Sequence, residues 1–174
     1  YIINKNNNNH ISVNVSFKTF SSDNFLPFIK DLCKKYPEIK DFFCIEISEN
    51  SALNLNMDIK SAFKELHNLG IKIAIDDFSM GNTSLKYLQE TKFDIVKLDG
   101  KLTSAITDSI ASREIISSIV YLSKSLNFSV IAEYVETLEQ KNLLEKLGCN
   151  YYQGYLYSPA VTIDELINNI NKDV

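Results

Sequence analysis

The stretch Ile71-Lys-Ile-Ala-Ile-Asp-Asp-Phe78 decides the fold of this chain. Its isoleucines at every second position, from Ile71 to Ile75, alternate with Lys72, Ala74 and Asp76. A period of two predicts a β-strand with one apolar face. Gly70, directly before the strand, is a good C-terminal stop for a preceding helix. Two acidic residues therefore stand together at the C-terminal end of a predicted strand.

The same strand-and-helix unit repeats on both sides of this stretch. Five further strands are predicted at Ile11–Phe17, Phe43–Ser48, Asp94–Leu98, Phe128–Glu133 and Asn150–Gly154. Amphipathic helices are predicted at about Asn24–Tyr36, Met57–Leu69, Leu138–Leu147 and Ile163–Lys172. Thr137 with Gln140, and Thr162 with Glu165, have the spacing of capping boxes at the last two helices.

Six strands that alternate with helices predict a parallel sheet of the α/β class. An open, doubly wound sheet and a closed barrel both remain possible at this point. Helices cover both faces of an open sheet, so its central strands are almost wholly apolar. Here one strand face is apolar and the other carries Asn14, Glu46 and Asp76 near its C-terminal end. This pattern favours an incomplete (β/α)8 TIM-like barrel of about six strands with outer helices.

Polar residues occur at or just after the end of every predicted strand. Parallel strands would bring them to one opening, and they are Asn14, Glu46, Asp76, Asp77, Lys97, Glu133 and Gln153. One lysine cannot neutralise four converging carboxylates, whereas hard divalent cations can. Carboxylate and amide oxygens suit Mg²⁺ or Mn²⁺, and the adjacent Asp76 and Asp77 suggest two ions, as in phosphodiester hydrolysis.

Composition excludes several other classes of function. The 174 residues carry a net charge of −4, so a groove for a nucleic-acid polymer is not expected. No apolar run is long enough for a membrane segment. The odd number of cysteines without C-x-x-C spacing indicates reduced core residues of a cytoplasmic protein. Neither a P-loop nor a dinucleotide motif occurs, and His10 and His67 are expected at the surface, without a catalytic partner.

Six short motifs in order resemble the EAL domain family over nearly the whole chain. Asn14-Val-Ser is similar to N-x-S, Glu46-Ile-Ser-Glu49 to E-x-T-E, and Ile75-Asp-Asp-Phe-Ser-Met-Gly81 to the D-D-F-G-x-G loop. Lys97-Leu-Asp99 resembles K-I-D, Ala132-Glu-Tyr-Val-Glu136 resembles A-E-G-V-E, and Gln153-Gly-Tyr-Leu-Tyr157 resembles Q-G-Y-L-F. Each motif alone is weak, but their common order is specific.

The resemblance implies a barrel that hydrolyses cyclic di-GMP to linear pGpG with Mg²⁺ or Mn²⁺. By the same resemblance, Asn14, Glu46 and Asp76 would bind one ion, and Asp76, Asp77 and Glu133 the second. Lys97, Glu133 and Gln153 are the catalytic candidates, and Lys97 and Gln153 would position the attacking water and the metal-bound ligands. Glu49 and Glu136 would support loops rather than contact the substrate.

This sequence departs from the family pattern at several places. The E-A-L segment itself is absent, so we expect residues 1–174 to be an EAL domain that lacks its N-terminal E-A-L strand region and one metal-binding Glu. Ser79 and Met80 replace the usual Gly and Thr, Asn82 replaces an aromatic residue, and Tyr134 replaces the Gly of A-E-G-V-E. A glycine at position 134 could adopt a positive φ, which tyrosine adopts at a cost.

Three functions follow as alternatives. The intact parent is expected to be an active phosphodiesterase of bacterial second-messenger signalling, with this chain alone weak or inactive. A degenerate EAL module that acts as a cyclic-di-GMP receptor or protein scaffold is the second possibility. An enolase-like barrel with Lys97 as base is the third, although Asp76-Asp77 counts against it. Expected partners are sensory or GGDEF domains and a second copy of the chain, because exposed strand edges near Ile11–Phe17 and Tyr152–Tyr155 favour self-association.

Overall fold

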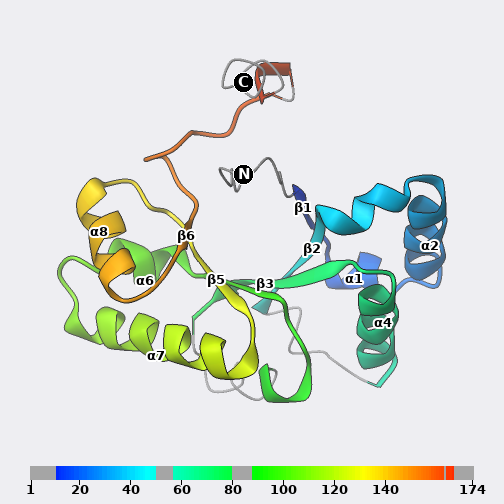
Figure 1. Ribbon diagram of the computed structural model, residues 1–174, viewed down its shortest axis with the longest axis horizontal. Coiled ribbons are helices and arrows are strands. Elements are labelled where there is room, and N and C mark those ends of the chain that lie inside the picture. The colour runs from blue at the N-terminus through cyan, green and yellow to red at the C-terminus, as the bar shows by residue number, and fades with distance from the viewer. Residues whose placement is uncertain (1–10, 50–56, 80–87, 163, 167–174) are drawn as a thin grey trace.

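A single parallel sheet organises the chain. The computed structural model describes residues 11–49, 57–79, 88–162 and 164–166 (Figure 1). Its strands are β1 (Ile11–Asn14), β2 (Phe43–Ser48), β3 (Lys72–Phe78), β4 (Ile95–Leu98), β5 (Ser129–Ala132) and β6 (Tyr151–Tyr152). Its helices are α1 (Phe17–Phe20), α2 (Phe25–Lys35), the 3₁₀-helix η1 (Pro37–Asp41), α4 (Met57–Asn68), α6 (Gly100–Ser104), α7 (Ile110–Leu126) and α8 (Leu138–Lys146).

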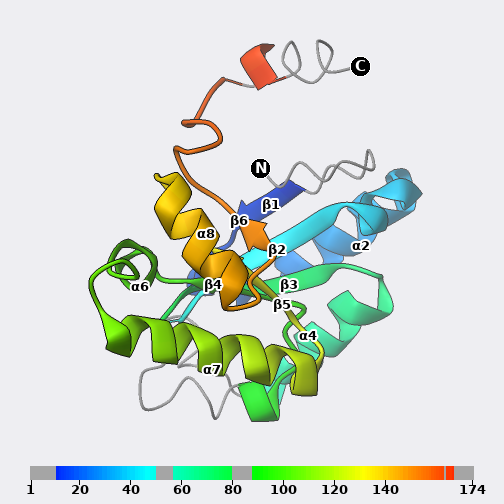
Figure 2. The same ribbon diagram turned by 60° about the vertical axis from the view of Figure 1, so that its left-hand side comes forward.

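The order of the strands decides between the two expected α/β architectures. The sheet runs β1-β2-β3-β4-β5-β6, and every neighbouring pair is parallel. A doubly wound sheet reverses its strand order at a switch point, and this sheet has no such point. Sequential parallel strands with outer helices are the geometry of a (β/α) barrel, and six of them make part of one (Figure 2). The predicted fold class is confirmed.

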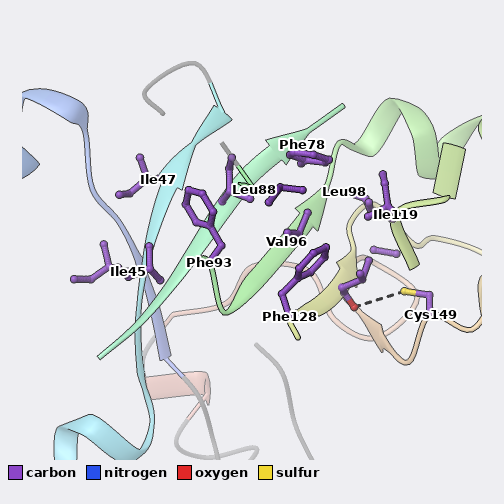
Figure 3. Close-up of a cluster of buried hydrophobic side chains, with 14 of the residues drawn as sticks. Ile45, Ile47, Phe78, Leu88, Phe93, Val96, Leu98, Ile119, Phe128 and Cys149 are labelled. Carbon is purple, nitrogen blue, oxygen red and sulfur yellow. Dashed lines mark hydrogen bonds between the residues drawn. The ribbon is translucent and has the colours of Figure 1, made fainter. Parts of the chain in front are cut away.

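The hydrophobic core lies between the outer face of the sheet and the helices. Alternate strand residues point to this face, and the fully buried Ile45, Ile73 and Val96 are examples from three adjacent strands. Figure 3 shows this layer continuing to Phe128, and to Cys149, whose thiol donates to the carbonyl of Val130 at 3.7 Å. All three cysteines are free, and burial raises the pKa of the Cys149 thiol. The apolar alternation seen in the sequence thus faces the helices.

Aromatic side chains join the helices at one end of the sheet to its core. The ring of Phe63 on α4 lies 5.3 Å from that of Phe20 and 5.6 Å from that of Phe93, both in edge-to-face geometry. Such contacts add to the stabilisation that comes from burial alone. In Figure 1, α2 and α4 lie at this end of the sheet, and α6, α7 and α8 lie at the other.

Most predicted elements are present, with corrections at their ends. The first predicted strand is too long, because β1 ends at Asn14 and α1 begins at Phe17. The Ser16 side chain accepts a hydrogen bond from the backbone N–H of Thr19 at 3.2 Å, which fixes the start of α1. The last three predicted strands are shorter than expected. Helices α2, α4 and α8 begin and end within one residue of their predicted bounds. Gly70, with φ +82°, follows α4 as expected.

Helices α6 and α7 lie between Leu98 and Phe128, where no helix was predicted from the sequence. The 17 residues of α7 follow the N-cap Ser109, whose side chain accepts from the N–H of Ser112, and precede the C-cap Asn127 with φ +57°. Serines at several α7 positions weaken the apolar periodicity that marks a helix. No helix in the described ranges combines the length and apolar character that a membrane crossing needs.

The last predicted helix, Ile163–Lys172, falls mostly outside the described residues, as do His10, Met80, Gly81 and Asn82. Its expected capping pair is present. The N–H of Thr162 donates to Glu165 Oε2 at 2.9 Å, and the N–H of Glu165 donates to Thr162 Oγ1 at 3.3 Å. Both contacts of a capping box are therefore made.

Candidate metal site

Four successive strands deliver charged side chains to the same rim of the sheet. Glu46 belongs to β2, Asp76 and Asp77 to β3, and Lys97 to β4, while Glu133 directly follows β5. All four strands are parallel, so their C-terminal ends lie at one edge. The pleat turns these residues away from the isoleucines and valines of the helix-facing layer. A polar site results at the mouth of the part-barrel.

Lys97 is the centre of this site. Its Nζ donates to Glu46 Oε2 at 2.9 Å and lies 2.8 Å from Glu133 Oε1 and 3.1 Å from Asp76 Oδ1. The Lys97 side chain is only 5% exposed, so water screens these ion pairs weakly. One ammonium group thus joins three strands through three carboxylates.

A β-bulge lets two adjacent aspartates reach the same rim. Along the pair of β3 with β4, Ile75 is opposite Val96 and Phe78 is opposite Leu98. Two residues of β3, Asp76 and Asp77, therefore face the single residue Lys97 of β4. Asp77 has φ +57°, a left-handed conformation that aspartate tolerates better than most residues. In a regular strand, these two side chains would point to opposite faces.

Asp76, Asp77 and Glu133 form a cluster with the geometry of a cation site. Each offers one carboxylate oxygen, and the three oxygens lie within 4.8 Å of one another. Opposite ligands of an ion are about 4.2 Å apart for Mg²⁺ and about 4.8 Å apart for Ca²⁺. Asp76 Oδ1 is buried and has no hydrogen-bond partner among the described residues, because its contact with Lys97 lacks hydrogen-bond geometry. The donor set and this unsatisfied oxygen fit a hard divalent cation.

Burial and neighbouring charges shift the pKa values of three groups at the rim. Burial raises the pKa of Asp77, and the charges of Asp76 and Asp99 raise it further. Burial also raises the pKa of Glu133 against the opposing effect of Lys97. Burial alone would lower the pKa of Lys97, but its contacts with Glu133 and Glu46 outweigh burial and raise it. Carboxyl groups with raised pKa values favour an added cation.

Two predicted site residues are near the cluster but not joined to it. Asn14 is the register partner of Glu46 on β1, and its side chain is exposed. Gln153 follows β6, and its backbone N–H donates to the carbonyl of Ala132 at 2.8 Å. Neither side chain makes a hydrogen bond to the carboxylates in the part of the chain that the structure describes. Their roles as ligand and catalytic residue stay predictions.

The two predicted loop-supporting residues are placed at the ends of strands. Glu49 Oε2 accepts from the N–H of Ser79 at 3.1 Å and from Ser79 Oγ at 3.0 Å, which ties the end of β2 to the segment after β3. The N–H of Glu136 donates to Gln140 Oε1 at 2.8 Å, while the Glu136 side chain is exposed. The first contact supports the loop role proposed for Glu49, and both roles stay predictions.

His67 was predicted to lie at the surface, but the structure places it in a partly buried position. It is 22% exposed on α4, and its Nε2 donates to Asp94 Oδ2 at 2.9 Å. The same Asp94 oxygen accepts from the N–H of Ile73 at 2.9 Å. Asp94 precedes β4, so this pair lies at the N-terminal edge of the sheet, opposite the acidic rim. The two residues are 27 positions apart, so no local sequence pattern predicts that they form a pair.

Fold and site together define an α/β barrel-type domain with an acidic cation site at the carboxyl ends of its strands. The model of one protein family, described as EAL domain, matches residues 2–160. The chain belongs to the EAL domain family, as its six motifs predicted.

Curated relatives agree with this assignment. The chain is 35% identical over 155 residues to the cyclic di-GMP phosphodiesterase PdeA of Borreliella burgdorferi, covering 89% of this chain and 23% of the relative. It is 32% identical over 161 residues to the cyclic di-GMP phosphodiesterase PdeL of Escherichia coli, covering 92% and 44%. The signaling protein YkoW of Bacillus subtilis is 34% identical over 152 residues, covering 87% and 19%. The chain spans less than half the length of these relatives.

Solved structures show the same architecture. The EAL enzyme Bd1971, in a form bound to cAMP and cyclic di-GMP, superposes with a TM-score of 0.86 at 29% identity over 92% of this chain and 43% of that one. BlrP1 of Klebsiella pneumoniae, in a complex with manganese and cyclic di-GMP, gives 0.78 at 27% identity over 86% and 38%. A calcium and cyclic di-GMP complex of BlrP1 gives the same values.

Proposed function

We propose that the protein containing this domain hydrolyses cyclic di-GMP to linear pGpG. The observation that carries the proposal is the convergence of Glu46, Asp76 and Glu133 from three strands onto Lys97 at one rim. The identity of the proposed substrate comes from membership of the EAL domain family and from relatives named cyclic di-GMP phosphodiesterases. The substrate is a small anion, so it needs positive charge at a rim where Lys97 is the one buried lysine among the described residues.

Two divalent ions, Mg²⁺ or Mn²⁺, would supply that charge. Asp76, Asp77 and Glu133 would hold one ion, and Asn14, Glu46 and Asp76 the other. Bound at the rim, such ions provide Lewis-acid stabilisation of the phosphoryl oxygens and lower the pKa of water. Asp76 Oδ1 is buried and accepts no hydrogen bond although it lies 3.1 Å from Lys97 Nζ, which supports its role as the shared ligand.

The remaining chemistry belongs to the residues of the chain. Lys97 would keep its proton, because its pKa is raised, and the N–H donor that Glu46 and Glu133 leave free would orient water or a phosphoryl oxygen at the rim. Glu133 is held by Lys97 at 2.8 Å, so its carboxylate is fixed for binding. Gln153, at the end of β6, would orient the same water with its amide. The apolar helix-facing layer fixes the strands that carry these groups.

The domain boundaries and partners are proposals of the same kind. Residues 1–174 would form the part of an EAL domain that follows its E-A-L strand region. Sensory or GGDEF domains in the full-length protein and a second copy of the domain are the proposed partners. The free cysteines support a reducing compartment, and the proposed location is the cytoplasm.

The test is hydrolysis of cyclic di-GMP by purified full-length protein with Mn²⁺, with pGpG measured by chromatography. Wild type should form pGpG, and Asp77→Asn and Glu133→Gln should each lower the rate at least about 100-fold, because each removes a proposed ligand charge. Asp31→Asn, an exposed change on α2, is the matched control and should keep full activity. A folded wild type that forms no pGpG would remove the proposal.

A second candidate function is a receptor that binds cyclic di-GMP without turnover. The observation that favours it is the unusual backbone of Tyr134, with φ +53°, where the family pattern has glycine. A tyrosine in this left-handed conformation, next to Glu133, would alter the geometry of the catalytic site. Calorimetric binding of cyclic di-GMP with no pGpG formed in Mn²⁺ would select the receptor function.

A further inference from the structure

Tyr134 has a backbone conformation that its side chain disfavours. Its φ of +53° lies in the left-handed region, where a bulky side chain is an outlier. The residue directly follows Glu133, so this strain lies at the edge of the candidate metal site. Strained residues of this kind cluster at ligand-binding and active sites.

The ring of Tyr134 spans the ends of two strands. A Cβ atom added to Gly100 would overlap the Tyr134 ring, so the ring lies directly against the backbone of that glycine. Gly100 is buried at the start of α6, two residues after the end of β4. The ring therefore bridges the rim between β4, which carries Lys97, and β5, which precedes Glu133.

This packing leaves most of the aromatic side chain in solvent. Tyr134 is 61% exposed although its ring covers Gly100. A tyrosine that served only the core would be buried, and a glycine here would avoid the strained backbone. A rigid, exposed aromatic surface beside a phosphate-binding rim is what proteins use to stack a nucleobase.

We propose that Tyr134 is a substrate-contacting specificity residue, whose ring stacks on a guanine base of the cyclic dinucleotide bound at the metal site. The inference rests on the proposed function. The ring would hold one base while the carboxylates and their ions hold the phosphodiester. Gly100 is its structural counterpart, because only a residue without a side chain leaves room for the ring.

The experiment measures binding of cyclic di-GMP to the full-length protein by calorimetry in Ca²⁺, with the melting temperature of each variant measured in parallel. Y134A and Y134G should each weaken binding about 10-fold, and Y134F should bind like wild type, because stacking needs the ring and not the hydroxyl. Y134G removes the ring together with the backbone strain, so it separates stacking from stability. Y121A, which changes a more exposed tyrosine on α7, is the matched control and should bind like wild type.

Each other outcome overturns the inference in a recognisable way. Equal binding by wild type, Y134A and Y134G, with a lower melting temperature in Y134A alone, shows that the ring only packs on Gly100. Tighter binding by Y134G shows that the ring obstructs the site. Absence of binding by folded wild type removes the proposed function, and the inference with it.

Discussion

At the residue scale, Lys97 decides how stable the acidic rim is without a metal. Its ammonium compensates three carboxylates, and both it and Glu46 are nearly buried. A buried ion pair is weak evidence for stability, but removal of one partner leaves uncompensated charge at a large cost. The lysine therefore acts as the counter-ion of the rim.

Lys97→Met should lower the free energy of unfolding of the metal-free protein by about 3 kcal/mol, because the buried carboxylates of Glu46 and Glu133 and the partly buried carboxylate of Asp76 lose their cation. Mn²⁺ should recover part of this loss, since a divalent ion binding the folded state replaces the missing charge. Urea unfolding with a chelator and with Mn²⁺ measures both effects. Lys101→Met, an exposed change on α6, should leave stability nearly unchanged. Equal stability of Lys97→Met and wild type in chelator would contradict this role.

Asp94 makes the stability of the domain sensitive to acid. Burial alone would raise the pKa of Asp94, but hydrogen bonds from His67 and Ile73 hold it below its usual value. A lowered folded-state pKa contributes stability above the unfolded value of about 3.9, and that stability is lost as pH falls through the folded pKa.

Asp94→Asn should therefore be less stable than wild type at pH 6, and the difference should shrink below about pH 4. Thermal unfolding of both proteins from pH 7 to pH 3 measures it. Asp31→Asn should match wild type throughout the range. A difference between Asp94→Asn and wild type that stays constant down to pH 3 would show that the carboxylate charge plays no part.

Some residues of the candidate site could be placed from the sequence, and others could not. Glu46, Asp76, Lys97 and Glu133 could be placed at one rim because they end successive predicted strands. The bulge that turns Asp77 to the same rim has no local sequence signal, since it depends on register with β4. The His67–Asp94 pair was missed because it forms between elements distant in sequence.

At the element scale, α8 begins at a complete capping box. Thr137 Oγ1 accepts from the N–H of Gln140 at 3.2 Å, and Gln140 Oε1 accepts from the N–H of Thr137 at 3.0 Å. The capping box predicted from sequence is confirmed.

Thr137→Ala should lower the free energy of unfolding by about 1 kcal/mol, because the N–H of Gln140 loses its acceptor. Asn142→Ala, an exposed change in the middle of α8, is the control and should be neutral or slightly stabilising. Urea denaturation of the two variants gives the comparison. A Thr137→Ala protein as stable as wild type would mean that water replaces the cap without cost.

Elements also show where sequence patterns fail. Helix α7 packs on β5 and buries Ile116 and Ile119, yet its serines obscured the periodicity. Helix α1 replaces the end of the first predicted strand, because alternation in Val15–Phe17 continues past the point where Ser16 caps a helix. In both cases a local capping contact carried more information than hydrophobic alternation.

At the scale of the whole molecule, β1 presents apolar residues at the edge of the sheet. Ile11 and Val13 are 49% and 42% exposed, and β1 pairs with β2 alone among the described strands. A parallel edge with exposed apolar side chains favours pairing with another chain.

We therefore expect the chain to self-associate, and Val13→Lys to weaken the association by placing a charge on that edge. Sedimentation velocity at increasing concentration measures the effect. Ile110→Lys removes a more exposed apolar residue at the start of α7 and should associate like wild type. A wild-type chain that stays monomeric at high concentration would contradict the expectation.

The overall architecture was predictable because two independent patterns agree. Strands with one apolar face and polar residues at their C-terminal ends favour a barrel over an open sheet. The sequential order of six parallel strands agrees with that prediction. The adjacent Asp76 and Asp77 suggest two ions, but the placement of the ligand oxygens depends on contacts between strands that no local sequence pattern contains.

Binding of divalent cations by Asp76, Asp77 and Glu133 at the acidic rim can be tested by anomalous diffraction from crystals grown with Mn²⁺. We expect a manganese peak bonded to carboxylate oxygens of all three residues, and its loss in a folded Asp77→Asn protein. A fully ordered rim without any manganese peak, at a Mn²⁺ concentration that saturates the activity, would contradict it.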